Sequence, residues 1–270
     1  MKIAIITGAS SGMGRELAIR LANDNPVDEK FDEMWLIARN ETELRKTSES
    51  VNIPCKIIPL DLTQEESLEQ FRSMLKEADP TVGILVNCSG YGKFKSTMDT
   101  ELKDIDGMID LNCKALVHTT VAVLPYMRRG SHILQLDSLS AFQPVPYLNV
   151  YAATKAFVLS FSRALAAEIR HLGIKVLAVC PGWVSTAFFK RAEHDENSEI
   201  NYFNKVFTPG FVASKAIKCM YRGNCDVYVP GLSVKLQVLA VKLLPHRLVM
   251  NIWLKQQGMS KNKKVRSKSV

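Results

Sequence analysis

The sequence lacks the marks of several protein classes. Its six cysteines form no Cys-x-x-Cys motif and have no partnered histidines, so we expect buried thiols in a reducing cytoplasm and no metal site. No apolar run is long enough to span a bilayer, and no secretory leader precedes the strand-like run Lys2–Ile6. Internal repeats and linkers are also missing before the basic C-terminal end. These absences favour a cytoplasmic globular protein, and 270 residues suit one large α/β domain or two small ones.

Acidic residues are missing from the C-terminal end. The last one is Asp226, and the 44 residues after it hold nine of the 35 Lys and Arg. Residues 1–226 therefore contain 26 Lys and Arg against 27 Asp and Glu, a net charge of −1, although the whole chain carries +8. A nearly neutral body argues against a nucleic-acid-binding core, so we expect no nucleic-acid partner.

Apolar runs without polar alternation recur along the chain and predict strands that are buried on both faces. After Lys2–Ile6 they are Met34–Ala38, Lys56–Leu60, Gly83–Val86, His132–Asp137, Ile174–Val179 and Val227–Val229. Helical patterns separate them: one from about Glu41, then Gln64–Lys76, about Asp104–Arg128, Tyr147–Leu172 and Pro209–Tyr221. Pro59 removes a ladder donor, so we expect the third strand at an edge of the sheet. The alternation predicts an α/β domain.

A glycine-rich turn, T-G-A-S-S-G-M-G at residues 7–14, follows the first strand and opens a helix. Gly8 permits a sharp turn, Gly12 lets the backbone approach a pyrophosphate, and Gly14 lets the helix pack on the strand. The helix start adds unpaired N–H groups and a positive dipole end. The segment predicts a dinucleotide-binding turn that includes Ser10, Ser11 and Met13; an ordinary strand–helix turn is the alternative.

The ends of the next strands indicate which dinucleotide is bound. Enzymes that use NAD place an acid after the second strand, but residues 34–40 contain none, and Arg39 offers a guanidinium to a 2′-phosphate instead. Arg15 could assist. A solvated surface arginine is the alternative for both, and it is favoured for Arg15 but not for Arg39. Asp61 and Leu62 follow the third strand, where the carboxylate could contact adenine or cap the next helix.

The fourth strand ends in N-C-S-G, Asn87–Gly90. Gly90 allows a ligand to approach closely, while Asn87 could simply brace the turn. Further along, Asn112 lies among apolar residues of a long helical pattern, which indicates either a helix interruption or a buried polar group, and a structural role is favoured. Ala187–Val206 is polar with interleaved aromatics, a composition that suits a mobile lid, with a plain surface loop as the alternative.

A tyrosine and a lysine lie four residues apart on the predicted helix after the fifth strand. Tyr151 and Lys155 therefore share a helix face, and a phenol beside a fixed ammonium can donate a proton. Ser138 ends the preceding strand and could offer a hydroxyl to the same substrate oxygen. Tyr91 and Lys95 have the same spacing, but glycines flank that tyrosine and predict a loop.

Taken together, these motifs resemble those of the short-chain dehydrogenase/reductase family, in its single-domain branch, over about residues 1–230. The matching residues are Thr7-Gly8-x3-Gly12-x-Gly14, Asn87-x-x-Gly90, Asn112, Ser138, Tyr151-x3-Lys155 and Pro181-Gly182-x3-Thr186. The family's usual N-N-A-G is N-C-S-G here, a small change at the cofactor site.

The resemblance implies a doubly wound, Rossmann-like sheet of seven parallel strands flanked by helices, as one domain over residues 1–230 with an extension at 231–270. It implies a catalytic set of Asn112, Ser138, Tyr151 and Lys155. Tyr151 would protonate a carbonyl oxygen that Ser138 binds, and Lys155 would hold the nicotinamide ribose and lower the phenol pKa. Asn112 would hold a water that links Lys155 to solvent.

The same resemblance implies the remaining cofactor contacts and the assembly. Pro181, Gly182, Val184 and Thr186 would contact the cofactor, with the last two fixing the carboxamide. Arg39 favours NADP(H) over NAD(H), and family members commonly form homodimers or homotetramers through the helices that carry Asn112 and Tyr151.

The C-terminal extension admits three interpretations. Leu232–Leu254 is apolar but interrupted by Lys235, Lys242 and Pro245, and a polybasic end follows it. This pattern fits a helix on a membrane surface, an arm that packs over the substrate cleft or a partner subunit, or a contact with another polyanion. With Trp183, Phe188 and Phe189 near the expected cleft, it favours a hydrophobic carbonyl substrate.

We therefore expect an NADP(H)-dependent carbonyl reductase or alcohol dehydrogenase in the cytoplasm, either free or attached to the cytoplasmic face of a membrane. One alternative is a 3-oxoacyl reductase that acts on carrier-bound chains. The other is a dinucleotide-sensing protein that has kept the cofactor site without the chemistry.

Overall fold

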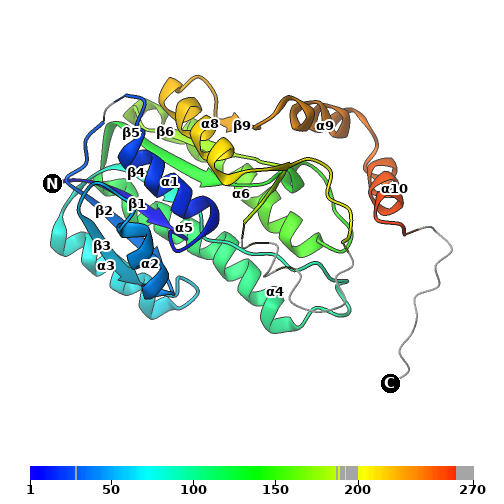
Figure 1. The fold of residues 1–270 in the computed structure, drawn as a ribbon, viewed down its shortest axis with the longest axis horizontal. Helices are drawn as coiled ribbons and strands as arrows, with labels where there is room; N and C mark the ends of the chain where they lie inside the picture. The colour runs from blue at the N-terminus through cyan, green and yellow to red at the C-terminus, as the bar shows by residue number, and fades with distance from the viewer. Residues whose placement is uncertain (28, 187, 189–191, 193–199, 260–270) are drawn as a thin grey trace.

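Seven parallel strands form one sheet in the order β3-β2-β1-β4-β5-β6-β9 (Figure 1). The computed structural model describes residues 1–27, 29–186, 188, 192 and 200–259. The strands are β1 (Lys2–Thr7), β2 (Glu33–Ala38), β3 (Cys55–Pro59), β4 (Thr81–Asn87), β5 (Met127–Leu136), β6 (Lys175–Val179) and β9 (Val227–Tyr228). The predicted seven-stranded doubly wound sheet is confirmed, with the proline-containing strand β3 at one edge.

Helices cover both faces of this sheet. One face carries α1 (Gly12–Asn23), α2 (Glu41–Ser48) and α8 (Pro209–Arg222); the other carries α3 (Glu65–Ala78), α5 (Ala115–Val123) and α6 (Asn149–Glu168). In β1, Ala4 and Ile6 pack on the first layer, and Ile3 and Ile5 pack on the second. All four are fully buried, which is why the strand shows no polar alternation.

Strand β1 lies at the point where the direction of the connections reverses. The chain runs outward from β1 to β2 and β3, then returns to β4 on the other side of β1. The loops after β1 and β4 therefore leave in opposite directions, which opens a crevice at the carboxyl ends of these strands. Thr7 ends β1 and Asn87 ends β4, so the predicted site motifs lie at this crevice.

Two predicted helices differ in the structure. The pattern expected over Asp104–Arg128 divides into α4 (Leu102–Ile109), a π-helical turn (Asp110–Lys114), α5 and a 3-10 turn (Leu124–Tyr126). Pro125 lies in that last turn, and a proline lacks the N–H that a continuing helix needs. Helix α6 begins at Asn149 rather than near Tyr147, because Tyr147 adopts a left-handed φ of +63°.

The chain ends in two helices, α9 (Leu232–Leu243) and α10 (His246–Gln256), which lie beyond β9 at the end of the molecule opposite the N-terminus (Figure 1). A two-stranded sheet of β7 (Trp183–Val184) and β8 (Val206–Phe207) connects β6 to α8. Among the described residues, no helix combines the length and apolarity that crossing a membrane requires. Cys180 and Cys219 are buried thiols as expected, whereas the other four cysteines are only half-buried.

Candidate active site

The glycine turn after β1 is shaped by close backbone approach. Gly8 and Gly12 have φ values of +68° and +54°, which side-chain-bearing residues rarely adopt. A Cβ on Gly8 would lie 2.8 Å from the backbone nitrogen of Ser89, and one on Gly14 would collide with the carbonyl oxygen of Gly8. The turn therefore admits no larger residues at these positions. It presents the N-terminus of α1, whose first turn contains no acidic residue, to the crevice.

A cavity of about 1120 Å³ runs along this turn. Its wall includes Arg39, Asp61, Leu62 and Gly90 of the predicted cofactor set. Seven other predicted cofactor residues also line this cavity: Gly8, Ser10, Ser11, Gly12, Met13, Gly14 and Thr186. The guanidinium of Arg39 is 65% exposed and lies 3.8 Å from the Asp61 carboxylate, a loose pairing that leaves donors free for a phosphate.

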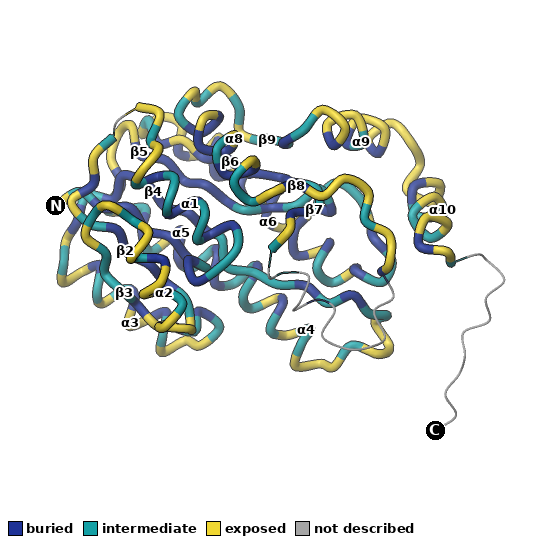
Figure 2. The backbone as a smooth tube through the Cα atoms, viewed as in Figure 1, coloured by how far each residue is buried: buried dark blue, intermediate teal, exposed yellow. Residues whose placement is uncertain are grey.

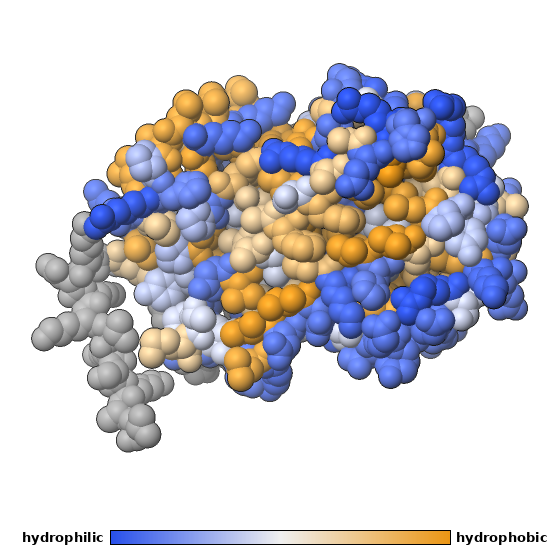
Figure 3. Space-filling view, turned by 180° about the vertical axis from the view of Figure 1, so that it is seen from behind, coloured by the Kyte–Doolittle hydropathy of each residue, from blue (hydrophilic) through white to orange (hydrophobic). Residues whose placement is uncertain are grey.

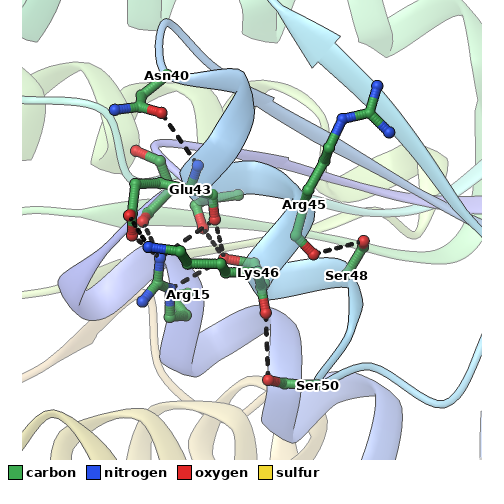
Figure 4. Close-up of polar contacts among 10 residues, drawn as sticks. Arg15, Asn40, Glu43, Arg45, Lys46, Ser48 and Ser50 are labelled. Atoms are coloured by element: carbon green, nitrogen blue, oxygen red, sulfur yellow. Dashed lines mark hydrogen bonds and ion pairs between the residues drawn. The ribbon is translucent and has the colours of Figure 1, made fainter.

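Arg15, by contrast, is held within the protein (Figure 4). Its guanidinium donates to the Glu43 carboxylate at 2.7 Å and to the Thr47 hydroxyl at 3.0 Å. Asn40 caps the same helix, α2, by accepting from the Glu43 backbone N–H at 3.0 Å. The hydrogen bonds from Lys46 and Arg15 lower the pKa of Glu43. Arg15 therefore ties α1 to α2 and does not line the cavity, in contrast to Arg39.

Asn87 braces the end of β4. Its amide donates to the Thr120 hydroxyl at 2.9 Å, and its oxygen accepts from the Thr119 hydroxyl at 2.8 Å. Asn87 is buried and does not line the cavity. Its side chain therefore braces the turn, which is one of the two roles that the sequence left open. Gly90 follows at the cavity wall, where an added Cβ would lie 3.0 Å from Asn112 Oδ1.

Asn112 lies in the π-helical turn and is completely buried. Its amide donates to the carbonyl of Tyr91 at 2.9 Å and to the Thr154 hydroxyl at 3.0 Å, while its oxygen accepts from the Tyr91 N–H at 3.0 Å. It therefore joins the loop after β4 to helix α6. The sequence offered a helix interruption or a buried polar group, and both apply, because the extra backbone residue of the π turn accommodates the buried amide.

Ser138, Tyr151 and Lys155 come together above the end of β5. Tyr151 and Lys155 lie one turn apart on α6, with the Lys155 ammonium 5.7 Å from the centre of the phenol ring. The Ser138 hydroxyl hydrogen-bonds the Tyr151 phenol and also accepts from the Ser140 N–H at 3.2 Å. Tyr91 of the rival pair lies in a loop instead of on a helix face, and its hydroxyl donates to the carbonyl of Asp104 at 3.1 Å.

Burial dominates the titration of this cluster. It raises the pKa of Tyr151, and the hydrogen bond with Ser138 only partly opposes the rise. Burial also lowers the pKa of Lys155, against the attraction of Asp137. The expected lowering of the Tyr151 pKa by Lys155 is therefore not found, because removing the phenolate from water outweighs the hydrogen bond that opposes it.

A second cavity, of about 950 Å³, begins at Ser138 and Tyr151. Met13, Leu136, Thr186 and Phe188 line both cavities, so the two adjoin along these residues. The Phe188 ring lies 5.3 Å from the Tyr151 ring, centre to centre. The second cavity also includes Pro181, Gly182 and Val184 of the predicted cofactor set. Its other walls are mostly apolar and include Val145, Leu148, Trp183 and Trp253. The arrangement places two hydroxyl groups in a mostly apolar pocket that adjoins the cavity along the glycine turn.

The model of the short chain dehydrogenase family matches residues 2–197 of this chain. The chain belongs to the short-chain dehydrogenase family. An uncharacterized oxidoreductase from Staphylococcus epidermidis is 30% identical to it over 205 residues, which span 75% of this chain and 86% of that protein.

Solved structures of other short-chain dehydrogenases share the architecture. One from Sphingobium yanoikuyae in complex with NADPH has a TM-score of 0.75 and 25% identity, and the match covers 100% of both chains. The bulky-bulky ketone specific alcohol dehydrogenase from Comamonas testosteroni has a TM-score of 0.69 and 25% identity, over 100% of this chain and 97% of that one.

The C-terminal helices of this short-chain dehydrogenase form part of the wall of the second cavity. An arm that packs over the cleft was one of the three interpretations that the sequence left open. Trp253 of α10 donates from its indole to the carbonyl of Pro146 at 3.0 Å, beside the start of α6. Gln257 accepts from the backbone N–H groups of Asn201 and Tyr202, both at 2.9 Å. Most of the predicted lid over 187–206, with Phe189, lies outside the described residues.

Sequence reasoning missed a buried acid in the dehydrogenase core. Asp137, directly before Ser138, is 2% exposed, and burial raises its pKa to about 7. One carboxylate oxygen accepts from the Cys180 thiol at 3.5 Å, and the other has no hydrogen-bond partner. The signal was an acid that ends an apolar strand, H-I-L-Q-L-D. In the described part of the chain, no group of three His, Cys, Asp or Glu side chains is arranged to hold a metal.

Proposed function

We propose that this short-chain dehydrogenase is an NADP(H)-dependent carbonyl reductase or alcohol dehydrogenase with a hydrophobic substrate. One observation carries the proposal: Ser138 and Tyr151 line the apolar cavity, and the Tyr151 ring packs against Phe188, which also lines the cavity along the glycine turn. A carbonyl group bound there can present its carbon to the nicotinamide end of the channel. Its oxygen then lies within reach of both hydroxyl groups.

NADPH, when bound, supplies the hydride. Tyr151 gives its proton to the carbonyl oxygen, and Ser138 donates a hydrogen bond to the same oxygen. Burial keeps the phenol protonated before the reaction, which is the state that a proton donor needs. Lys155 binds the nicotinamide ribose, and its charge stabilises the phenolate that remains. Asn112 keeps its place as the link between the loop after β4 and α6. A water beside it would connect Lys155 to solvent.

The residues around the channel fit NADP(H). The turn from Gly8 to Gly14 leaves room for the pyrophosphate at the start of α1, and no acid lies in the first turn of that helix. Arg39 is exposed beside the adenosine end and binds the 2′-phosphate, which favours NADP(H) over NAD(H). Asp61 and Leu62 contact the adenine, and Val184 and Thr186 fix the carboxamide. The NADPH complex of the relative from Sphingobium yanoikuyae supports this choice.

The substrate is a bulky apolar ketone or the corresponding alcohol. The walls of the cavity are mostly apolar, and Trp183, Phe188 and Trp253 supply large aromatic surfaces. The Comamonas testosteroni enzyme, whose stated substrates are bulky-bulky ketones, matches this chain along its whole length and supports the proposal. NADP(H) preference points to reduction in the cytoplasm. Residues 231–270 form an extension of the catalytic domain of residues 1–230.

The enzyme acts as a homodimer or homotetramer. Phe157 of α6 is 47% exposed and Val121 of α5 is 56% exposed. These two helices, which follow Asn112 and carry Tyr151, therefore present apolar side chains on the outside of the protein. Phe157 also stacks on Phe161, with 6.4 Å between the ring centres. A second copy packed on this face would bury these rings.

Replacing Tyr151 with Phe tests the proton-donor role. Tyr151→Phe should lower kcat by about 100-fold or more while NADPH affinity stays almost unchanged, because only the hydroxyl is lost. Tyr91→Phe is the matched control, since that phenol belongs to the rival pair with the same spacing and binds a backbone carbonyl. Turnover is followed by NADPH oxidation, and affinity by fluorescence titration.

The substrate panel should contain free bulky ketones and acyl thioesters. Turnover of the free ketones supports the proposal, and turnover of the thioesters alone would make the enzyme a 3-oxoacyl reductase. NADPH binding by the wild type without turnover of any member would support the dinucleotide-sensing alternative. Wild-type turnover by Tyr151→Phe would refute the assignment of the proton donor.

A further inference from the structure

Helix α9 carries apolar side chains on two opposite faces. Its inner face, with Val234, Val238 and Val241, is buried against the domain. Its outer face carries four leucines that are 74%, 59%, 55% and 76% exposed: Leu232, Leu236, Leu239 and Leu243, the leucine stripe. Steps of four, three and four residues align them along the helix. A surface helix usually keeps its outer face polar, so the leucine stripe calls for a partner.

The apolar surface continues from α9 onto α10. Leu244, Leu248 and Ile252 are 37%, 45% and 43% exposed. In the rear view, hydrophobic side chains gather over the end of the molecule that holds these two helices (Figure 3). The tube view shows exposed positions along the outer side of α9 (Figure 2). The two helices therefore present one continuous apolar surface at the end of the molecule that also contains the substrate cavity.

Every formal charge on these helices is positive. Lys235 and Lys242 lie on α9, Arg247 and Lys255 lie on α10, and neither helix contains Asp or Glu. On α9 both lysines lie to the same side of the leucine stripe, about a fifth of a turn away. The sequence after α10 adds five more Lys and Arg between residues 261 and 268 and no acid. The partner of this surface must therefore be both apolar and anionic.

We propose that the leucine stripe and the neighbouring α10 residues dock on the surface of an anionic membrane, with both helices lying in the plane of the interface. Exposed apolar side chains beside cations are the features that such a surface binds. A two-fold contact between copies of this chain would instead bring together two helix pairs whose formal charges are all positive. Surface docking also agrees with the absence, among the described helices, of one that could cross a membrane.

Docking would bring the substrate cavity to the bilayer. Gln237 of α9 and Trp253 and Gln256 of α10 line that cavity from the inner side of the same helices. If the proposed activity on apolar ketones holds, the substrate could reach the site from the lipid phase. This consequence rests on the proposed function, whereas the docking itself does not.

Vesicle sedimentation of the full-length protein tests the docking surface. The test variant is Leu236→Gln/Leu239→Gln, which removes the centre of the leucine stripe and leaves the cavity lining intact. The matched control is Met98→Gln/Leu102→Gln, two residues that are 94% and 76% exposed near the start of α4. Vesicles of phosphatidylcholine with phosphatidylglycerol are compared with phosphatidylcholine alone, at low and high salt.

The wild type and the control should sediment with the anionic vesicles and be released by salt, because cations contribute to the contact. The test variant should bind about tenfold or more weakly, since two apolar side chains are lost from the interface. Its thermal midpoint and its turnover of a water-soluble ketone should equal those of the wild type. A failure of turnover in every form would count against the proposed function alone.

Three results would overturn the docking proposal. One is equal sedimentation of the wild type and the test variant with anionic vesicles. Another is wild-type binding to neutral vesicles as strong as to anionic ones, which would remove the electrostatic argument. The third is a wild type that ignores vesicles while the test variant shows a smaller mass by light scattering, which would assign the leucine stripe to a second copy.

Discussion

The ammonium group of Lys155 donates a hydrogen bond to the carbonyl oxygen of Leu136 over 2.7 Å. This bond joins helix α6 to the end of strand β5, two residues before Ser138. Because Tyr151 lies one turn before Lys155 on the same helix, the bond also fixes the phenol relative to the serine hydroxyl. Lys155 thus positions the side chains of the site and also contributes a positive charge to it, even though burial lowers the pKa of the lysine.

Replacing Lys155 with Met should lower kcat by about 100-fold or more and raise the KM for NADPH. The variant loses the charge that stabilises the phenolate and the proposed contact with the ribose. It also leaves the Leu136 carbonyl without its donor, which costs about 1–3 kcal/mol of unfolding free energy. Steady-state kinetics and thermal unfolding measure the two effects separately. A variant with wild-type kcat would remove Lys155 from the proposed chemistry.

Asp137 predicts a pH dependence of stability. Burial raises its folded-state pKa from 3.8 to about 7, against the opposing charges of Lys155 and Arg163 on α6 and the bond from Cys180. Between these pH values the folded protein keeps a proton that the unfolded chain releases. The unfolding free energy from this group therefore falls as pH rises from about 4 to about 7, by up to about 4 kcal/mol.

Asp137→Asn tests this, because the amide cannot titrate. The thermal midpoint of the variant, relative to that of the wild type, should increase as pH is raised from about 4 to about 8. Asp106→Asn on α4 is the control, since Asp106 is exposed. Parallel pH profiles for the wild type and Asp137→Asn would mean that the carboxyl is already ionised at low pH.

Local patterns in the sequence were sufficient for the sheet and for the main site motifs. The first strand is apolar at every position from Ile3 to Ile6 because both of its faces are buried, and this leaves a signal that needs no tertiary information. The positive φ of Gly8 and the edge position of the strand with Pro59 follow from backbone chemistry in the same way.

The features that the sequence did not disclose depend on contacts between distant residues. Trp253 binds the carbonyl of Pro146 across 107 positions, and no periodicity records that α10 becomes a wall of the cavity. Arg15 and Arg39 look alike in the sequence, but of these two arginines Arg15 is the one that binds Glu43 and Thr47. The elevated pKa of Tyr151 likewise arises from burial, which the Tyr-x3-Lys spacing does not reveal.

Replacing Arg39 with Ala should raise the KM for NADPH by roughly 10- to 100-fold, the effect of losing a charge-assisted bond to the 2′-phosphate. The KM for NADH, which lacks that phosphate, should change little. Arg45→Ala is the control, because Arg45 lies on neighbouring α2, is 64% exposed and pairs with Glu41. Equal losses with both cofactors would show that Arg39 acts on the fold and not on the phosphate.

Replacing Phe157 with Glu should reduce the mass of the assembly measured by size-exclusion chromatography with light scattering. The exposed ring of Phe157 lies on the helix layer proposed as the subunit interface, and a carboxylate buried there would have no partner. Phe211→Glu is the control: Phe211 is 40% exposed on α8, which covers the other face of the sheet. The proposed interface predicts an assembled wild type and an assembled Phe211→Glu protein. A monomeric wild type, or dissociation by Phe211→Glu in place of Phe157→Glu, would contradict it.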